Sequence, residues 1–347
     1  MNKNLVIVTD NNDFFGQTRR PWVSMDVPKI IKLLSERNIK VKKYAVHELI
    51  NNPEKVQDSL IFYSFNQKLN RRNYINDLIH HYSTSKNILI PSYDLLKCHE
   101  NKGFQELYKR KLNIDSLNAY YLSCFKEVPS YDIKYPVVLK SVDGSNGKGV
   151  FLANNKEELI TKIKKLEKTR LVRHIDLFRR KHFRSKKFKD YPNYSNRKDY
   201  EQYQDYIIRE ENFVLQEFIP DLSCDYRVLI MHDKYFVTKR ETRDNDFRAS
   251  GAKKFRFNFK VEDSLLNYAE EVYSKFDTPF LSIDIVIHDN NHYLLEFQAL
   301  HFGINVLVKS NGYFRKDNGN WKFVESENVI ENEMAYGLAE YINENYS

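Results

Sequence analysis

The segment 136–151, with the sequence PVVLKSVDGSNGKGVF, limits the fold of this chain more than any other part of it. An apolar run ends at Lys140, and a loop with three glycines and Lys148 separates it from a second apolar run. Two apolar runs joined by a glycine-rich loop predict paired β-strands. Glycine permits positive φ angles and a close approach of the backbone to a ligand, and successive N–H groups in such a loop can hold an anion. The segment is therefore either a plain hairpin or a loop over nucleotide phosphates.

The length and composition of the chain are typical of a globular protein with two or three domains. It has 347 residues, of which 41% are hydrophobic and 29% are charged. No apolar run approaches the roughly 20 residues of a membrane span, and the run 5–8 is too short for a secretory signal. Three widely spaced cysteines indicate neither a metal cluster nor a disulfide framework. We therefore expect a cytoplasmic protein without membrane insertion.

The net charge of +8 is concentrated in one segment. Residues 162–189 contain thirteen Lys and Arg residues and two acidic residues, so this segment carries +11 and the rest of the chain is slightly acidic. Such a run is either a solvated helical face or a clamp for an anionic partner, such as a substrate with carboxylates or phosphates, or a nucleic acid. The aromatic residues are spread along the chain, which is typical of core packing and disfavours a nucleic-acid partner.

Strands and helices alternate over the first 90 residues. The apolar spacing predicts strands at 5–8, 41–46, 59–63 and 88–90 and helices at 27–38 and 74–82. This alternation indicates a small α/β domain, and ligands of such sheets bind beyond the carboxyl ends of the strands. The loop 10–22 is therefore either a substrate loop, with Arg19, Arg20 and Trp22 as contacts, or a simple surface loop.

The rest of the chain predicts two α+β regions. Helices are expected at 93–112, 156–166, 265–275 and 330–342, and hairpins at 227–238 and 281–298. We place the domains at 1–91, at 92–212 with the glycine loop and the basic segment, and at 213–347. The overall class is thus α/β with α+β regions.

The hairpin 281–298 carries a candidate metal site. Asp284 and Glu296 lie on its two strands, and Glu296 and Gln298 share one face because side chains alternate along a strand. Magnesium prefers oxygen ligands and often binds one or two carboxylates together with nucleotide phosphates. The alternative is an exposed cross-strand polar pair, but the neighbouring residues are apolar, where such groups are costly without a partner.

In chain order, these features form a series that ends in the segment DFRASG at 246–251 and the hairpin 281–298. The series resembles the ATP-grasp superfamily of carboxylate–amine ligases. It is most similar to the branch that contains the ribosomal-protein glutamate ligase and the lysine-biosynthesis ligases. The resemblance covers about residues 92–303. It implies an ATP-grasp fold, in which a small N-terminal α/β domain precedes two α+β lobes that clamp ATP.

The resemblance implies the following nucleotide-binding residues: Lys102, Lys140, Gly144, Ser145, Gly147, Lys148, Gly149, Gln216, Glu217, Phe218, Ile219, Asp225, Arg248 and Ser250. Lys102 and Lys140 would neutralise phosphates as point charges, and the loop 144–149 would close over them. The hinge 216–219 would read the adenine edge, with Glu217 serving the adenine or the ribose. Asp225 would lie by the ribose.

The resemblance also implies catalytic and metal positions. Arg227 and Arg240 would face an acyl phosphate or the substrate carboxylate, and Arg248 would lie close to the triphosphate with Ser250. One or two Mg²⁺ ions, with Mn²⁺ as a substitute, would be held by Asp284, Glu296 and Gln298. The family usually has Asn at the third metal position, so the longer Gln298 puts the second ion in question. His301 departs from the usual small-residue turn and either contacts the substrate or caps the turn.

The implied reaction is ATP-dependent amide formation. A substrate carboxylate would attack the γ-phosphate of ATP, and an amine or amino acid would then attack the acyl phosphate. The basic segment favours an anionic acceptor, such as a surface polysaccharide precursor or an acidic peptide. Two alternatives stay open: a kinase on the same scaffold, and a nucleotide-responsive nucleic-acid-binding protein. A homodimer is the default expectation for the oligomeric state.

Overall fold

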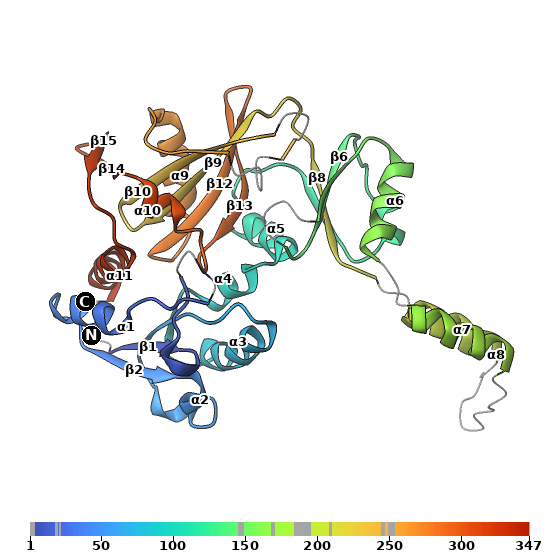
Figure 1. Cartoon of the computed structure of the whole chain (residues 1–347), viewed down its shortest axis with the longest axis horizontal. Helices are drawn as coiled ribbons and strands as arrows, with labels where there is room; N and C mark the ends of the chain where they lie inside the picture. Colours follow the sequence, from blue (N-terminus) through green and yellow to red (C-terminus); the bar gives the residue numbers. More distant parts are fainter. Residues whose placement is uncertain are drawn as a thin grey trace. The chain divides into compact units, whose positions relative to one another are not determined.

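The computed structural model describes residues 4–17, 20, 22–144, 149–167, 171–183, 196–207, 210–243, 247–248 and 254–346 (Figure 1). The chain forms two compact units. The first, which we call the discontinuous unit, combines Met1–Leu117 with Ile219–Ser347. The second, which we call the inserted unit, is Asn118–Phe218. Both units mix helices with strands, which confirms the predicted fold class.

A parallel four-stranded sheet begins the discontinuous unit. Its order is β2-β1-β3-β4, formed by β1 (Leu5–Thr9), β2 (Val41–Ala45), β3 (Leu60–Tyr63) and β4 (Ile88–Ile90). Three helices follow the strands: α1 (Val27–Ser35), α2 (Val46–Leu49) and α3 (Leu69–Ser83). Asp26 caps α1 through a bond from the Lys29 amide, and Val27, Ile30 and Leu34 are buried. The α/β alternation predicted for the first 90 residues is confirmed.

A seven-stranded sheet forms the second half of this unit. Its order is β13-β12-β9-β10-β14-β15, with β11 paired to β10, from β9 (Cys224–Met231), β10 (Lys234–Glu241), β11 (Lys254–Arg256), β12 (Phe280–His288), β13 (Asn291–Gln298), β14 (Gly312–Asp317) and β15 (Asn320–Glu325). Both hairpins predicted from the sequence, β9–β10 and β12–β13, are confirmed. The central strands β9 and β12 come from different hairpins and pair antiparallel.

The two faces of this sheet differ. On one face, the alternating residues Val228, Ile230 and Ile283 pack in a core with α9 (Asp263–Ser274), α4 (Tyr93–Cys98) and α5 (Lys102–Lys111). On the other face, Leu229, Phe236 and Phe280 join a second core with α1, α10 (Asn305–Lys309) and α11 (Ile330–Tyr346). Figure 1 shows α11 lying beside α1. This second face is apolar only near the β9–β10 turn, and its other half carries charged residues.

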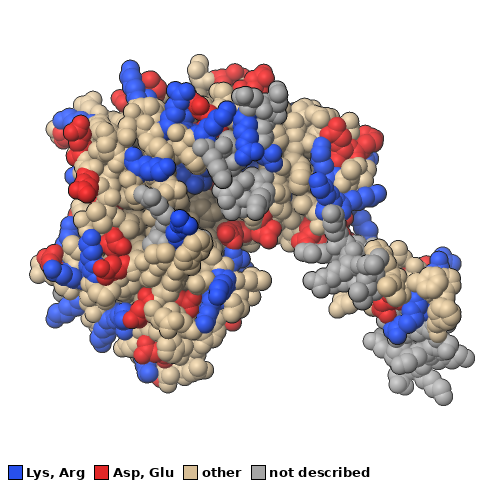
Figure 2. All heavy atoms as spheres, viewed as in Figure 1, with Lys and Arg blue, Asp and Glu red and all other residues tan. Residues whose placement is uncertain are grey.

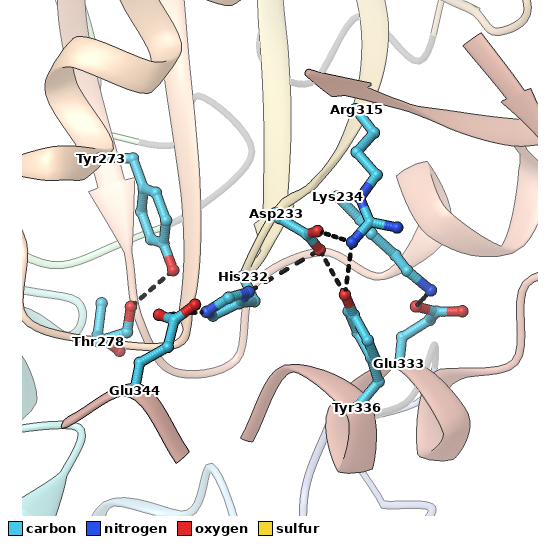
Figure 3. A network of polar contacts seen from close by, with 9 residues as sticks. All are labelled: His232, Asp233, Lys234, Tyr273, Thr278, Arg315, Glu333, Tyr336 and Glu344. Carbon is cyan, nitrogen blue, oxygen red and sulfur yellow. Dashed lines mark hydrogen bonds and ion pairs between the residues drawn. The ribbon is translucent and has the colours of Figure 1, made fainter. Parts of the chain in front are cut away.

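Charged and aromatic side chains attach the β9–β10 turn to helix α11 (Figure 3). We call this group the turn network. His232 Nε2 lies 3.0 Å from Glu344 Oε2, and the Lys234 ammonium lies 2.8 Å from Glu333 Oε2. Asp233 accepts a bond from the Tyr336 hydroxyl at 2.9 Å and pairs with Arg315 on β14. The network therefore fixes the C-terminal helix to the end of the hairpin.

The inserted unit contains an antiparallel sheet of order β5-β8-β6-β7. Its strands are β5 (Ala119–Leu122), β6 (Val137–Ser141), β7 (Val150–Ala153) and β8 (Phe213–Glu217), and its helices are α6 (Lys156–Leu166), α7 (Leu171–Phe183) and α8 (Asn196–Ile207). Helix α6 packs on one face, where Leu159 and Ile163 meet Leu139 and Leu215. Since β8 pairs with β5 and β6, the strand at 213–217 belongs to this unit. The predicted domain limits remain predictions.

The structure departs from the sequence expectation in the region 93–112. One helix was predicted there, whereas α4 ends at Cys98 and α5 begins at Lys102. Glu100 adopts a positive φ of 48°, and the Asn101 side chain caps α5 by accepting a bond from the Phe104 amide. Along the described part of the chain, none of the helices is long and apolar enough to cross a membrane.

Candidate active site

The charged half of the seven-stranded sheet gathers most of the residues predicted for catalysis and metal binding. In the strand register, Arg227 on β9 lies opposite Asp284 on β12, which in turn lies opposite Glu296 on β13. Asp225 lies opposite Arg240 on β10. Directly opposed residues and residues two apart share a face. These five side chains therefore lie on the same face, and we call them the charged row.

Two arginines and two carboxylates of the charged row form a continuous network. Arg227 donates Nε to Asp284 Oδ1 at 2.7 Å and Nη2 to Oδ2 at 2.8 Å. Arg240 donates Nε and Nη2 to Asp225, both at 2.6 Å, and its Nη2 also lies 2.8 Å from Asp284 Oδ2. Bidentate pairs of this kind fix both partners in one geometry. The network therefore holds the arginines in place before any ligand binds.

Burial and charge act in opposite directions on these groups. Asp225, Arg240 and Asp284 are all buried. Burial alone would raise the pKa of Asp284, but the charges of Arg227 and Arg240 lower it below its usual range. Burial raises the pKa of Asp225 despite its contact with Arg240. Asp284 is therefore ionised at neutral pH, and its two oxygens accept from both guanidinium groups.

One of the predicted metal ligands, Gln298, contacts a histidine that the sequence did not single out. Gln298 Oε1 lies 3.1 Å from His99 Nδ1, and His99 Nε2 lies 3.3 Å from Gln67 Oε1. The rings of His99 and His301 have their centres 5.2 Å apart, and Phe65 packs against both. Within the described ranges, no three His, Cys, Asp or Glu side chains form a metal-binding group. The predicted metal set would therefore need the amide of Gln298 in addition to the carboxylates.

His301 lies in a tight turn after β13. It has a positive φ of 50°, and a side-chain atom added at Gly16 would lie 2.6 Å from its Cε1. Its Nε2 is buried and has no hydrogen-bond partner in the part of the chain that is described. Burial and the nearby His99 lower the pKa of His301, so the ring is neutral at pH 7. Both roles considered for His301 stay open.

The inserted unit brings Lys140 and Gln216 to one face of its sheet. Lys140 lies opposite Val214, and Gln216 lies opposite Val138, so all four share the face opposite the α6 core. Both Lys140 and Gln216 are buried. Gln216 Nε2 has no hydrogen-bond partner among the described residues. A cation, an unpartnered amide and apolar side chains on one face are the groups that a phosphate-bearing aromatic ligand needs.

The glycine-rich loop begins and ends in left-handed backbone. Gly144 has φ 106° and Gly149 has φ 74°, angles that favour glycine. A side-chain atom at Gly149 would also lie 2.0 Å from Ser141 Oγ. The Ser141 amide donates to the Gly149 carbonyl at 2.8 Å, which closes the hairpin. The remaining predicted loop residues, Ser145, Gly147 and Lys148, lie outside the described residues.

The other predicted nucleotide residues are spread over both units. Lys102 is buried at the start of α5, and Ile219 is buried just after β8. Glu217 is exposed and accepts a bond from Asn118 at 3.2 Å. Phe218 and Arg248 are partly buried, with the Arg248 guanidinium 5.8 Å from the Phe247 ring, and Ser250 lies outside the described ranges.

The predicted substrate loop 10–22 follows β1. The Asp10 carboxylate accepts bonds from the amides of Asn11 at 2.7 Å and Asn66 at 3.1 Å, which ties this loop to the one after β3. The Arg20 guanidinium lies 5.5 Å from the centre of the exposed Trp22 ring. Arg19 lies outside the described residues. Its role in substrate binding stays a prediction.

Comparison with known proteins identifies the fold. Residues 99–181 match the family described as RimK-like ATP-grasp domain. No curated protein sequence matches the chain. The matching family agrees with the resemblance seen in the sequence, which is thereby confirmed.

Three solved structures are similar over nearly the whole chain. D-cycloserine synthetase DcsG is 11% identical, covers 97% of this chain and 98% of its own, and has a TM-score of 0.53. The ATP-grasp ligase PsnB, complexed with precursor peptide PsnA2 and AMPPNP, is 10% identical with 98% coverage of both chains and a TM-score of 0.52. The macrocyclase MdnC bound with precursor peptide MdnA, from Microcystis aeruginosa MRC, is 12% identical, with coverages of 97% and 99% and a TM-score of 0.50. At these identities the likeness concerns the fold alone.

Proposed function

Because the chain has the ATP-grasp fold and a RimK-like ATP-grasp domain at residues 99–181, we propose that it is an ATP- and Mg²⁺-dependent ligase. It joins a carboxylate to an amine through an acyl phosphate. The observation that carries this proposal is the charged row, in which Arg227 and Arg240 are held rigidly by Asp225 and Asp284 and Glu296 continues the same face.

Arginines fixed in this way suit the stabilisation of a charged intermediate. Electrostatic catalysis depends on donors that are already oriented, because no reorganisation is then needed during the reaction. The contact between Arg227 and Asp284 uses Nε and Nη2, so Nη1 is not part of it and lies beside Gly303. We assign to Arg227 Nη1 the binding of an oxygen of the acyl phosphate or of the substrate carboxylate.

The residues fit a bound nucleotide. In the inserted unit, buried Lys140 supplies a positive charge for a phosphate, and the orphaned amide of Gln216 can pair with a polar edge of adenine. Val138 and Val214 on the same face suit an aromatic ring. In the reaction, the substrate carboxylate attacks the γ-phosphorus of ATP and ADP leaves. The amine then attacks the acyl carbon, and phosphate leaves with the two electrons of the broken C–O bond.

The donor set also fits magnesium, because Asp284, Glu296 and Gln298 offer the oxygen ligands that it prefers. When bound, the ion would offset negative charge on the phosphates. Asp284 already accepts bonds from two arginines. We therefore assign the main metal contact to Glu296, with Gln298 beside it and Asp284 sharing its charge between the ion and the arginines.

We further propose that the acceptor is anionic. The basic segment 162–189 supports this, and two similar structures, PsnB and MdnC, are complexes with precursor peptides. An acidic peptide or a uronic-acid-bearing polysaccharide precursor is the substrate class that we infer, with an amino acid or amine as the second substrate. Three free cysteines fit a reducing compartment, so we place the reaction in the cytoplasm.

The test is a phosphate-release screen with ATP, Mg²⁺, pooled amines and pooled carboxylates. Release should require both pools, and Glu296→Gln should reduce it by at least about a hundredfold. A kinase would instead form ADP without free phosphate and would need no amine. The loss of the amine requirement would therefore overturn the ligase assignment.

Nucleotide binding is tested separately with Lys140→Ala. The loss of a buried phosphate contact should weaken ATP binding about tenfold or more in calorimetry, because a charged hydrogen bond contributes roughly 1.5–3 kcal/mol. Lys156→Ala, an exposed lysine at the start of α6, is the matched control. Equal ATP affinity of the Lys140 variant and this control would remove Lys140 from the site.

A further inference from the structure

Helices α7 and α8 form a pair within the inserted unit that packs mainly on itself. The Tyr203 hydroxyl on α8 donates to Asp176 on α7, and the Lys181 ammonium lies 5.8 Å from the centre of the Tyr200 ring. Figure 1 shows the two helices side by side. Asp176 and Lys181, five residues apart, thus lie at the two edges of the side of α7 that α8 covers.

The opposite side of α7 is exposed and carries two apolar side chains and a histidine, with Arg179 four residues after Ile175 on the same side. Ile175, Phe178 and His182 follow each other at spacings of three and four residues, so they lie along one face of the helix. The exposed fractions are 62% for Ile175, 61% for Phe178 and 73% for Phe183. The Phe178 ring centre lies 4.7 Å from that of His182 and 6.2 Å from that of Phe183. We call Ile175, Phe178 and His182, together with Phe183 at the edge nearer to Asp176, the aromatic stripe.

Basic residues accompany the aromatic stripe. Arg179 and Lys181 belong to α7. Arg179 is 76% exposed and pairs with Asp176 at 3.0 Å. The surrounding segment 162–189 has a net charge of +11. In Figure 2, this helix pair presents mostly uncharged atoms, with basic and a few acidic side chains among them. A helix with exposed Phe and Ile along one face and Lys and Arg beside it has the composition of an interfacial membrane helix.

We propose that α7 binds the surface of an anionic lipid bilayer, with the aromatic stripe at the boundary of headgroups and acyl chains. The stripe supplies apolar contact, and the basic residues pair with lipid phosphates, which attract polybasic segments. Long Lys and Arg side chains can keep their charges at the headgroups while the stripe lies deeper. This is surface binding, not a span, so it is compatible with the expected absence of membrane insertion.

The positive charge of segment 162–189 also favours a bilayer over two other partners of the aromatic stripe, a second copy of α7 and an acidic peptide. A second copy of α7 would bring two strongly basic segments together, which is unfavourable. An acidic peptide would satisfy the charge, but it would need its own apolar face matched to a single convex helix. A bilayer supplies negative charge and an adaptable apolar layer together, so it accounts for both features of α7, whereas the anionic acceptor proposed above would account for the charge alone.

The test uses the full-length protein and vesicle co-sedimentation. We expect binding to vesicles of phosphatidylcholine with about one third phosphatidylglycerol, and little binding to phosphatidylcholine alone. Ile175→Ser combined with Phe178→Ser should reduce the bound fraction about tenfold. Leu69→Ser, at a position that is 64% exposed on α3, is the matched control and should bind like the wild type.

A second variant keeps the test informative if the serine variant unfolds. Arg179→Gln with Lys181→Gln should weaken binding about fivefold for each lost charge at low salt, and this difference should shrink at high salt. Thermal unfolding checks that each variant is folded. Failure of the folded wild type to bind anionic vesicles would overturn the proposal. So would binding to an acidic amphipathic peptide without binding to vesicles, which would assign the stripe to a protein partner.

Discussion

The two ends of the β9–β10 hairpin carry ionic networks of different kinds. At the open end, Arg240 is held between Asp225 and Asp284 on the half of the sheet face that carries charged residues. At the closed end, the turn network joins His232, Asp233 and Lys234 to helix α11 (Figure 3). The same pair of strands thus holds a set of oriented cations at one end and a helix at the other.

This difference shows how position on a sheet separates chemistry from anchoring. The charged row is built from side chains of neighbouring strands, so its geometry is set by backbone pairing. The turn network joins a strand turn to a helix that is distant in sequence, so its geometry depends on tertiary packing. We expect changes in the charged row to affect both activity and stability, and changes in the turn network to affect stability alone.

Removing Arg240 should have the largest effect. Arg240→Ala leaves Asp225 buried without its bidentate partner, and breaking a buried pair in this way costs about 3–5 kcal/mol. Urea unfolding measures the loss, and phosphate release should disappear as well. Adding Asp225→Ala to the variant should restore part of the stability but none of the activity. A loss below about 1 kcal/mol would show that the pair is not structurally important.

Lys234→Met should destabilise the protein without affecting catalysis. The Lys234 ammonium pairs with Glu333, whose side chain is 6% exposed, and lies 4.3 Å from the centre of the Tyr336 ring. Leaving Glu333 unpaired should cost about 2 kcal/mol. The double variant with Glu333→Gln should recover much of this loss. Reduced phosphate release per folded molecule would contradict the proposed separation of the two ends.

Glu296→Gln should do the reverse of Lys234→Met: it should reduce activity strongly and change the stability only slightly. The amide keeps the size of the side chain but removes the charge, so the free energy of unfolding should change by less than about 1 kcal/mol. Turnover should nevertheless fall by at least about a hundredfold if Glu296 is the main metal ligand. Increasing the Mg²⁺ concentration in the assay should recover part of the lost rate. Full activity in the variant would refute the metal assignment.

His232→Gln should have the smallest effect on stability, and this effect should be detected as a change in the pH dependence of unfolding. Burial would lower the pKa of His232, but Asp233 and Glu344 raise it above its ordinary value of 6.5. Its contribution is therefore fully present below pH 6.5 and is lost as the pH rises through the raised pKa. The advantage of the wild type over the variant should fall by about 1 kcal/mol or less across this range.

The control for this experiment is the difference between wild type and variant at each pH, measured by urea unfolding. His99 and His301 have lowered pKa values, so they make the protein less stable at low pH in both chains. Their contribution cancels in the difference. A difference that stays constant between about pH 6 and pH 8 would show that His232 is not charged in the folded protein.

Local signals explain which parts of the fold could be predicted. The β9–β10 and β12–β13 hairpins follow from short polar turns between apolar runs, and these turns carry positive φ angles at His232, Asp289 and Asn290. The break before α5 could have been found from Asn101, a typical capping residue. These features depend only on residues close together in the chain.

Only some contacts of the charged row could be predicted from the sequence. The pairing of Asp225 with Arg240 follows from the hairpin, because both residues are equally distant from the turn. The pairing of Arg227 with Asp284 requires β9 to lie beside β12, which no local signal specifies. The contact between His99 and Gln298 likewise joins residues from different halves of the discontinuous unit. The site residues chosen from the sequence thus stay predictions, but their mutual contacts give those predictions a geometric test.

The discontinuous unit also constrains the order in which the parts of the chain can fold during synthesis. One face of its N-terminal sheet packs in the same core as Leu229, Phe280 and Leu338, which are made after the inserted unit. A nascent chain that ends before α11 therefore leaves β1 and α1 with exposed apolar surface, whereas 118–218 already contains all four strands of its own sheet. The inserted unit can therefore fold on the ribosome, whereas the N-terminal sheet completes its core only after α11 has been made.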